Sequence, residues 1–320
     1  MRRPAPSVSP ILAASALAML LLSACGPSSG SEPTSSSSAG KAISVTAGFY
    51  PYEFVAARVG GEDVQVTNLT SPGGEPHDLE LTPQQVAALS RTDLVVYSRG
   101  FQPAVDEAVD QQAADRALDV LTTVELLEGD HDAHEGESKG ADEPAHEDEG
   151  AGDPHVWLDP VRLATIAEAV AEQLAERAPE RADGFRQRAA ELGAELKTLD
   201  EELRSGLADC PRKEIVTSHD AFGYLAASYG LEQVSIAGLS PEDEASPKRL
   251  AEVATFAKQN NVTTIFFEEL ASPKVAQSLA REVGAEAQVL SPLEGPPDTG
   301  DYLSAMRTNL DSLRAALGCA

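Results

Sequence analysis

The chain has 320 residues, of which 42% are hydrophobic, so it is long enough for two medium domains or one large one. Its 52 aspartates and glutamates outnumber its 24 lysines and arginines and give a formal net charge of −28. A surface this negative repels nucleic acid and anionic lipid head groups, so the composition excludes a nucleic-acid-binding protein and is compatible with a cation-binding one.

The N-terminus has the pattern of a bacterial export signal. Basic residues precede an apolar run over 11–22, which is too short to span a bilayer. The run leads into small residues followed by Cys25, a pattern that resembles a lipoprotein signal in which this cysteine carries the lipid. We therefore predict a lipoprotein signal peptide over 1–24, lipidation of Cys25 and a flexible Gly/Ser-rich tether over 25–41. An ordinary signal peptide with an incidental cysteine is the alternative.

From residue 42 onward, strand-like and helical segments alternate. Strand-like runs cover 43–47, 63–67 and 94–97, and helical segments cover 50–59, 103–110 and 161–177. A further helix is predicted to begin at Thr82 and Pro83, because threonine is a favoured N-cap and proline is favoured at the first helical position. We assign 42–181 to an N-terminal α/β lobe.

An acidic segment over 128–153 interrupts this lobe. It is composed almost wholly of Asp, Glu, His, Gly, Ala and Pro, which cannot drive collapse into a core. We predict a disordered loop that contains His131, His134 and His146. The loop is either a low-affinity collector or sensor of metal cations, or a solvated insertion without a role in binding.

A long helix is predicted over 182–208. Apolar residues recur along it at alternating spacings of four and three, which places them on one face: Phe185, Ala189, Leu192, Leu196, Leu199 and Leu203. Charged residues occupy its other faces. We interpret this helix as a linker between two lobes, and a surface helix of a single domain is the alternative.

The alternation resumes over 209–320, the predicted C-terminal lobe. Strand-like runs cover 214–217, 233–236, 263–267 and 287–290, and helical segments cover 221–229, 247–259, 273–283 and 301–316. The predicted fold class is therefore α/β, with two Rossmann-like lobes that contain parallel-rich sheets and are joined by one long helix. Cys210 and Cys319 are an even pair in an exported chain, which predicts a disulfide, whereas two unpaired thiols are the alternative.

The histidines outside the acidic loop are candidate metal ligands. His77, His155 and His219 each follow a predicted strand or lie in a connecting loop. Glu294 has a similar position after the strand-like run that ends at residue 290. Because ligands of open α/β sheets bind beyond the carboxyl ends of the strands, a cleft between two lobes would bring these side chains together. Three imidazoles and one carboxylate suit tetrahedral zinc.

Other carboxylates near these histidines leave alternatives open. Glu268 and Glu269 end a predicted strand, and either could replace Glu294 as the fourth ligand. Asp78 and Asp220 each follow a candidate histidine directly. They would either accept a hydrogen bond that fixes the imidazole tautomer, or cap helices and face solvent.

Several segments of the chain resemble, in order, one known family. They are Gly48-Phe-Tyr-Pro-Tyr, Glu75-Pro-His-Asp-Leu-Glu-Leu-Thr-Pro, Asp153-Pro-His-Val-Trp-Leu-Asp-Pro, Thr217-Ser-His-Asp-Ala-Phe-Gly-Tyr-Leu and Pro292-Leu-Glu-Gly. Over residues 42–318 the chain is similar to the ZnuA-like zinc-binding solute receptors of bacterial ABC importers. The resemblance implies two α/β lobes bridged by a rigid helix, with a metal site in the cleft between the lobes.

The resemblance also assigns the ligands. The family's three histidine ligands fall on His77, His155 and His219, and its carboxylate position falls on Glu294. Manganese-binding relatives usually carry a glutamate where His219 stands, so the chain resembles the zinc branch.

The resemblance implies a zinc receptor rather than an enzyme. It would be a monomer anchored to the outer face of the cell membrane by the lipid on Cys25, and it would deliver Zn²⁺ to an ABC transporter permease. A receptor for manganese or another divalent metal, or an adhesin of the same family, is the nearest alternative. A secreted zinc hydrolase is a further one, but the sequence lacks a His-Glu-x-x-His helix, and a coordinating Glu294 would fill the position that a catalytic water needs.

Overall fold

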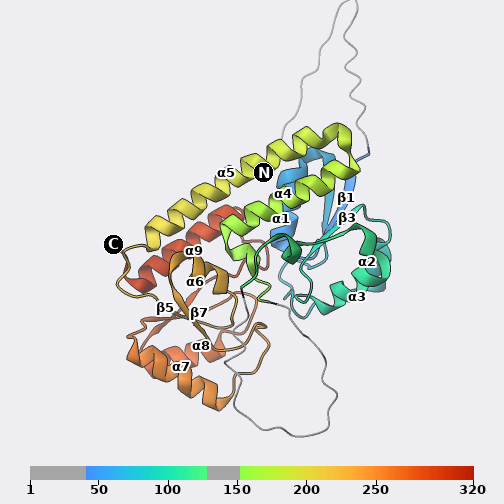
Figure 1. Ribbon diagram of the computed structural model, residues 1–320. Helices are drawn as coiled ribbons and strands as arrows, with labels where there is room; N and C mark the ends of the chain where they lie inside the picture. The colour runs from blue at the N-terminus through green and yellow to red at the C-terminus, as the bar shows by residue number, and fades with distance from the viewer. Residues whose placement is uncertain (1–40, 128–151) are drawn as a thin grey trace, which may run out of the picture. The chain divides into compact units, whose positions relative to one another are not determined.

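The computed structural model describes residues 41–127 and 152–320 (Figure 1). The predicted signal peptide, Cys25 and the tether up to residue 40 lie outside the described residues, as do His131, His134 and His146. No helix in the described part of the chain is both long enough and apolar enough to cross a membrane.

The N-terminal lobe is built on a parallel sheet. The strands are β1 (Ile43–Ala47), β2 (Val64–Asn68), β3 (Leu94–Tyr97) and β4 (Ala117–Asp119), in the order β2-β1-β3-β4. The helices are α1 (Tyr50–Gly60), α2 (Pro83–Leu89), α3 (Pro103–Gln112) and α4 (Pro160–Arg177), with 3-10 turns η1 (Gly61–Asp63), η2 (Ala114–Arg116), η3 (Val120–Thr123), η5 (Val156–Leu158) and η6 (Pro179–Arg181). The sequence analysis did not identify β4, because its residues are only partly buried and show no apolar run.

The C-terminal lobe repeats this topology. Its parallel strands are β5 (Glu214–Thr217), β6 (Glu232–Ser235), β7 (Thr264–Phe267) and β8 (Glu286–Val289), in the order β6-β5-β7-β8. The helices are α6 (Gly223–Tyr229), α7 (Pro247–Gln259), α8 (Lys274–Val283) and α9 (Tyr302–Leu317). In both sheets the first strand of the lobe lies in the interior, so the loops after the central strands meet at one edge of each sheet.

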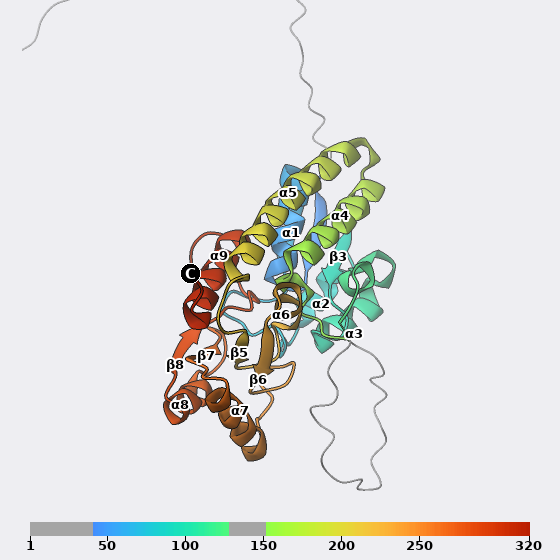
Figure 2. The ribbon, with the colours of Figure 1, turned by 60° about the vertical axis from the view of Figure 1, so that its left-hand side comes forward.

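The long helix α5 (Ala182–Leu207) contacts both lobes. It packs against α1 and α4 of the N-terminal lobe and against α9 of the C-terminal lobe, and Figures 1 and 2 show it running alongside these helices. Its buried residues are those of the predicted stripe together with Leu207, and they belong to one apolar cluster that includes residues of both lobes. The predicted two-lobe α/β fold with a long connecting helix is therefore confirmed.

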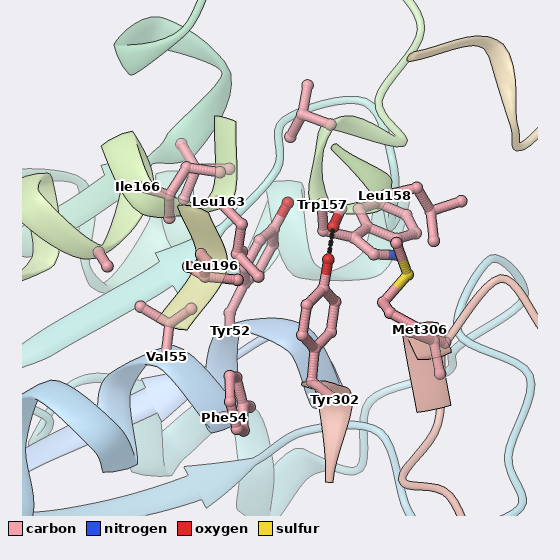
Figure 3. Packing of buried hydrophobic residues seen from close by; sticks show 14 of the residues in the cluster. Tyr52, Phe54, Val55, Trp157, Leu158, Leu163, Ile166, Leu196, Tyr302 and Met306 are labelled. Carbon is pink, nitrogen blue, oxygen red and sulfur yellow. Dashed lines mark hydrogen bonds between the residues drawn. The ribbon is translucent and has the colours of Figure 1, made fainter. Parts of the chain in front are cut away.

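The apolar cluster shared by the lobes lies beside η5 (Figure 3). The Tyr302 hydroxyl at the start of α9 donates a hydrogen bond of 2.5 Å to the carbonyl of Trp157 in η5. The ring of Tyr302 stacks on Phe54 of α1 with their centroids 5.5 Å apart. Residues of both lobes therefore meet beside the segment that carries His155.

The predicted pairing of Cys210 with Cys319 is confirmed by a disulfide between them. It joins the chain after α9 to the chain just after α5, across 109 residues of sequence. Arg212 supports the same junction by donating hydrogen bonds to the carbonyl of Ala316. The C-terminus is thus fixed to the start of the C-terminal lobe.

Candidate metal centre

The four candidate ligands lie together, although they come from separate parts of the chain. His77 lies in the loop between β2 and α2, and His155 directly precedes η5. His219 follows β5, and Glu294 lies between β8 and α9. One ligand atom from each residue lies within 4.8 Å of those of the other three. The structure therefore brings together every residue of the predicted site.

The cluster is almost closed to solvent. His155, His219 and Glu294 are buried, whereas the side chain of His77 is 9% exposed. The Oε1 atom of Glu294 lies 3.4 Å from Nε2 of His77, 3.6 Å from Nε2 of His219 and 3.8 Å from Nε2 of His155. The carboxylate thus faces all three imidazoles through their Nε2 atoms.

Two further carboxylates hold the imidazoles from behind. His155 donates from Nδ1 to Oδ1 of Asp153 over 2.7 Å, and His219 donates from Nδ1 to Oε1 of Glu268 over 2.8 Å. Because each Nδ1 donates its proton to a carboxylate, Nε2 is the nitrogen that each ring presents to a metal ion once it carries no proton of its own. Both Nε2 atoms turn towards Glu294.

The atoms that converge lack partners in the protein. Nε2 of His155, Nε2 of His219 and Oε2 of Glu294 are buried without a hydrogen-bond partner among the described residues. Buried polar atoms are nearly always satisfied, and those left unsatisfied require an explanation. Imidazole nitrogens and a carboxylate at one point are the donor set that zinc takes in tetrahedral sites, so the residues present fit Zn²⁺.

The geometry separates the carboxylates that the sequence left as alternatives. Glu268 is buried but is bonded to His219 Nδ1 and to the Ser218 hydroxyl, so it lies behind the imidazole. Glu269 is exposed. The arrangement therefore favours Glu294 as the fourth ligand and gives Glu268 the task of orienting His219.

Neither Asp78 nor Asp220 accepts a hydrogen bond from an imidazole in the described structure. Asp78 is exposed, and the backbone N–H of Asp220 donates to the carbonyl of Gly238. Asp153 and Glu268, rather than Asp78 and Asp220, accept the hydrogen bonds that fix the imidazole tautomers. The sequence analysis missed Asp153 in this role. Its position two residues before His155 is a detectable signal, because an aspartate there can accept a hydrogen bond from the backbone N–H two residues later. Asp153 accepts this bond from His155 over 2.9 Å.

The loop that carries Glu294 is held by hydrogen bonds from two other elements. The indole N–H of Trp157 donates to the carbonyl of Pro292 over 2.7 Å, and Asn309 of α9 both accepts from Ser291 N–H and donates to the Ser291 carbonyl. Leu293, between them and Glu294, has a φ of 57°, in the left-handed region that non-glycine residues rarely adopt. Such strain is retained when the surroundings impose it, and it is common at binding sites.

The electrostatics of the four residues are those of a site that holds positive charge. Burial lowers the pKa of His219, but the carboxylates of Glu268, which accepts from Nδ1, and of Glu294, 3.6 Å from Nε2, outweigh it and raise the pKa to about 10. Burial also opposes ionisation of Glu294, but the neighbouring imidazoles of His219 and His77 outweigh it and hold its pKa well below the ordinary value. Without a metal, a proton on His219 therefore compensates the Glu294 carboxylate.

A zinc ion bound by His219 would compete with this proton, so binding would depend on pH. With its pKa raised, metal-free His219 is doubly protonated at neutral pH, and zinc would have to displace the second proton. We expect affinity to fall by up to about tenfold for each unit that the pH is lowered through the neutral range. Titration calorimetry in two buffers with different ionisation enthalpies measures the protons released, and identical heats in both buffers would contradict this expectation.

A cavity of about 350 Å³ opens beside His77. Its lining includes residues of both lobes: Asp78, Arg99 and Phe101 from one, and Leu239, Ser240 and Asp243 from the other. The cavity therefore reaches the cluster at His77, its most exposed member.

Residues 45–316 match the model of one protein family, ZnuA, described as the periplasmic component A of the zinc-uptake complex. The chain belongs to the ZnuA family. This confirms the family to which the sequence motifs pointed, and the four clustered side chains lie within the matched range.

Individual relatives agree with this membership. The chain is 38% identical over 313 residues to the high-affinity zinc uptake system protein ZnuA of Bacillus subtilis, covering 94% of this chain and 95% of that protein. It is 35% identical to the zinc-binding lipoprotein AdcA of Streptococcus pneumoniae, over 85% of this chain but only 55% of that protein.

Solved structures share the fold. The Zn(II)-bound ZnuA-like domain of Streptococcus pneumoniae AdcA aligns with a TM-score of 0.70 at 33% identity, covering 87% of this chain and 99% of that domain. The laminin-binding protein Lmb of Streptococcus agalactiae, described as bifunctional with adhesin and metal-transporting activity, aligns with a TM-score of 0.75 at 31% identity over 86% of this chain and 99% of its own.

Proposed function

We propose that this protein is an extracytoplasmic receptor that captures Zn²⁺ with His77, His155, His219 and Glu294 and delivers it to the permease of an ABC importer. The observation that carries the proposal is the convergence of buried, unpartnered ligand atoms within 4.8 Å of one another. The names of the ZnuA and AdcA relatives, which are zinc-uptake or zinc-binding proteins, support the choice of metal.

Capture replaces the water around zinc with the four side chains. The ion enters past His77 and meets two imidazoles that Asp153 and Glu268 already hold with Nε2 turned inward. Ligands held in place in advance lose little conformational entropy on binding, and the buried surroundings strengthen their attraction to the ion. Glu294 neutralises half of the ion's charge, and the carboxylates of Asp153 and Glu268, behind two of the imidazoles, add further negative charge near the ion.

The proposal includes a lipid anchor at Cys25, a monomeric state and a permease as partner. The printed name of the AdcA relative, a lipoprotein, supports the anchor. The adhesin activity belongs to the Lmb description, and no described residue of this chain favours it. Against a zinc hydrolase, Glu294 occupies the position that a catalytic water would need.

Native mass spectrometry and competitive titration of the mature protein test this function. We expect one tightly bound zinc per chain and preference for zinc over manganese, because imidazole suits zinc better than the harder manganese ion. In cells that depend on this receptor, its deletion should reduce growth in zinc-depleted medium, and zinc should restore growth. Preferential binding of manganese, or turnover of an ester or peptide that requires His219, would overturn the proposal.

We expect the acidic segment to be dispensable for the tight site, apart from its last two residues. The prediction of a disordered loop over 128–153 is wrong for Gly152 and Asp153, because the structure describes both and Asp153 is buried and bonded to His155. Gly152 lies next to Leu127, since a Cβ on Gly152 would lie 2.9 Å from the carbonyl oxygen of Leu127. We expect a variant with 128–151 replaced by a short Gly/Ser turn to keep its tight zinc site, with an affinity change of no more than about threefold. Calorimetry on both forms measures this, and loss of the tight site would place a ligand within the removed segment.

A further inference from the structure

The two residues that begin α6 enclose Asp153, the residue that orients His155. Gly223 and Tyr224 belong to the C-terminal lobe, and Asp153 belongs to the segment that leads into η5. Tyr224 is fully buried and Asp153 is 7% exposed. The contact is therefore an interior one between distant parts of the chain.

The Tyr224 hydroxyl bonds the backbone on both sides of the 128–151 segment. It donates to the carbonyl of Asp153 over 2.7 Å and accepts from the N–H of Leu127 over 3.1 Å. The guanidinium of Arg162 lies over the Tyr224 ring, 4.7 Å from its centroid. One hydroxyl group of the C-terminal lobe thus bonds both Leu127 and Asp153.

Gly223 leaves room for the Asp153 carboxylate. A Cβ at position 223 would lie 2.8 Å from Oδ2 of Asp153, closer than such atoms approach. The other oxygen, Oδ1, accepts from the backbone N–H and from Nδ1 of His155. The carboxylate is therefore confined between Gly223 on one side and His155 on the other.

We propose that Gly223 and Tyr224 are positioning residues for zinc binding, which hold Asp153 so that its carboxylate keeps Nε2 of His155 turned into the site. The proposal rests on the proposed function and adds two residues outside the ligand set that support it.

The expected loss of zinc affinity can be estimated from what is known of groups that hydrogen-bond to metal ligands. If Asp153 moves, Nδ1 of buried His155 loses its acceptor, and the imidazole is no longer held in one tautomer and one orientation. Mutation of groups that orient metal ligands costs about 10- to 100-fold in metal affinity. Tyr224 acts one step further away, so we place its effect near the lower end of this range.

Tyr224→Phe tests the proposal with the loss of a single oxygen atom. We expect zinc affinity to fall about tenfold, chiefly through faster dissociation, and the visible spectrum of the Co²⁺-loaded protein to change because the geometry of His155 changes. Tyr229→Phe is the matched control: it lies on the same helix and donates to Asp200, remote in sequence from the ligands, so its zinc affinity and Co²⁺ spectrum should match the wild type.

Gly223→Ala adds a methyl group on the side of the Asp153 carboxylate opposite His155. The atom that must move is the end of a side chain, so we expect the variant to fold, and its zinc affinity should also fall. In an Asp153→Ala background the carboxylate is absent, so Tyr224→Phe should cause little further loss.

Three results would overturn the proposal: wild-type affinity and spectrum in Tyr224→Phe, equal losses in Tyr224→Phe and Tyr229→Phe, or a full additional loss in the Asp153→Ala background. Failure of the proposed function is a separate result, because the wild type itself would then show no tight zinc site.

Discussion

We expect His219→Ala to lower the zinc affinity of the mature protein by about a thousandfold, equivalent to about 4 kcal/mol of binding free energy. The substitution removes one of the four converging candidate ligands. It also leaves the buried carboxylate of Glu268 without its imidazole partner. Titration against a chelator of known affinity measures the loss.

The consequence for Glu268 requires a control for folding. A buried carboxylate that loses its partner destabilises the protein, so His219→Ala should also lower the melting temperature of the metal-free form. The double variant His219→Ala, Glu268→Gln removes the unpaired charge and should recover part of this stability without recovering zinc binding. Near wild-type zinc affinity in His219→Ala would show that His219 is not a ligand.

The parts of the fold that the sequence predicts well are those with a regular pattern. The apolar stripe of α5 follows the period of a helix over its full length, and an even pair of cysteines in an exported chain leaves one intramolecular partner for each. The candidate ligands are also predicted from their positions in the sequence, because residues that follow the strands of a parallel sheet gather at the same edge of that sheet. These arguments need only positions along the chain.

The parts that the sequence does not predict depend on which segments become neighbours. Glu268 ends up behind His219 because β7 lies next to β5, an order that the strand patterns do not contain. The contact of Tyr224 with Asp153 joins residues 71 positions apart and follows from the packing of one lobe on the other. Strand β4 is short and partly buried, so its pattern is too weak to detect.

The direction in which Glu294 points also depends on tertiary structure. Its strand-end position is shared by Glu268 and Glu269, so position alone cannot distinguish the three. The left-handed backbone at Leu293 and the Trp157 hydrogen bond to Pro292 fix the loop in the arrangement that turns Glu294 inward. The inward orientation of Glu294, the proposed fourth ligand, therefore depends on a backbone conformation that contacts outside its own loop support.

This selection leads to a comparison of three isosteric substitutions. Glu294→Gln removes the negative charge at the centre of the imidazoles while keeping the size of the side chain, and we expect a loss of zinc affinity of about a hundredfold or more, since an amide oxygen is a weaker ligand than a carboxylate. Glu268→Gln removes the charge behind His219 and should cost about 10- to 100-fold. Glu269→Gln is the matched control, because Glu269 is exposed and should have no effect on affinity.

The order of these three effects identifies the ligand. Converting a carboxylate to an amide should cost more zinc affinity when the carboxylate binds the ion directly than when it acts through an imidazole. The directly bound group interacts with the full charge of the ion. Calorimetry at one pH, with each metal-free variant checked for an unchanged melting transition, gives the ranking. If Glu268→Gln weakened binding more than Glu294→Gln, Glu268 rather than Glu294 would be the fourth ligand, and zinc binding would require the His219 loop to turn from its present orientation.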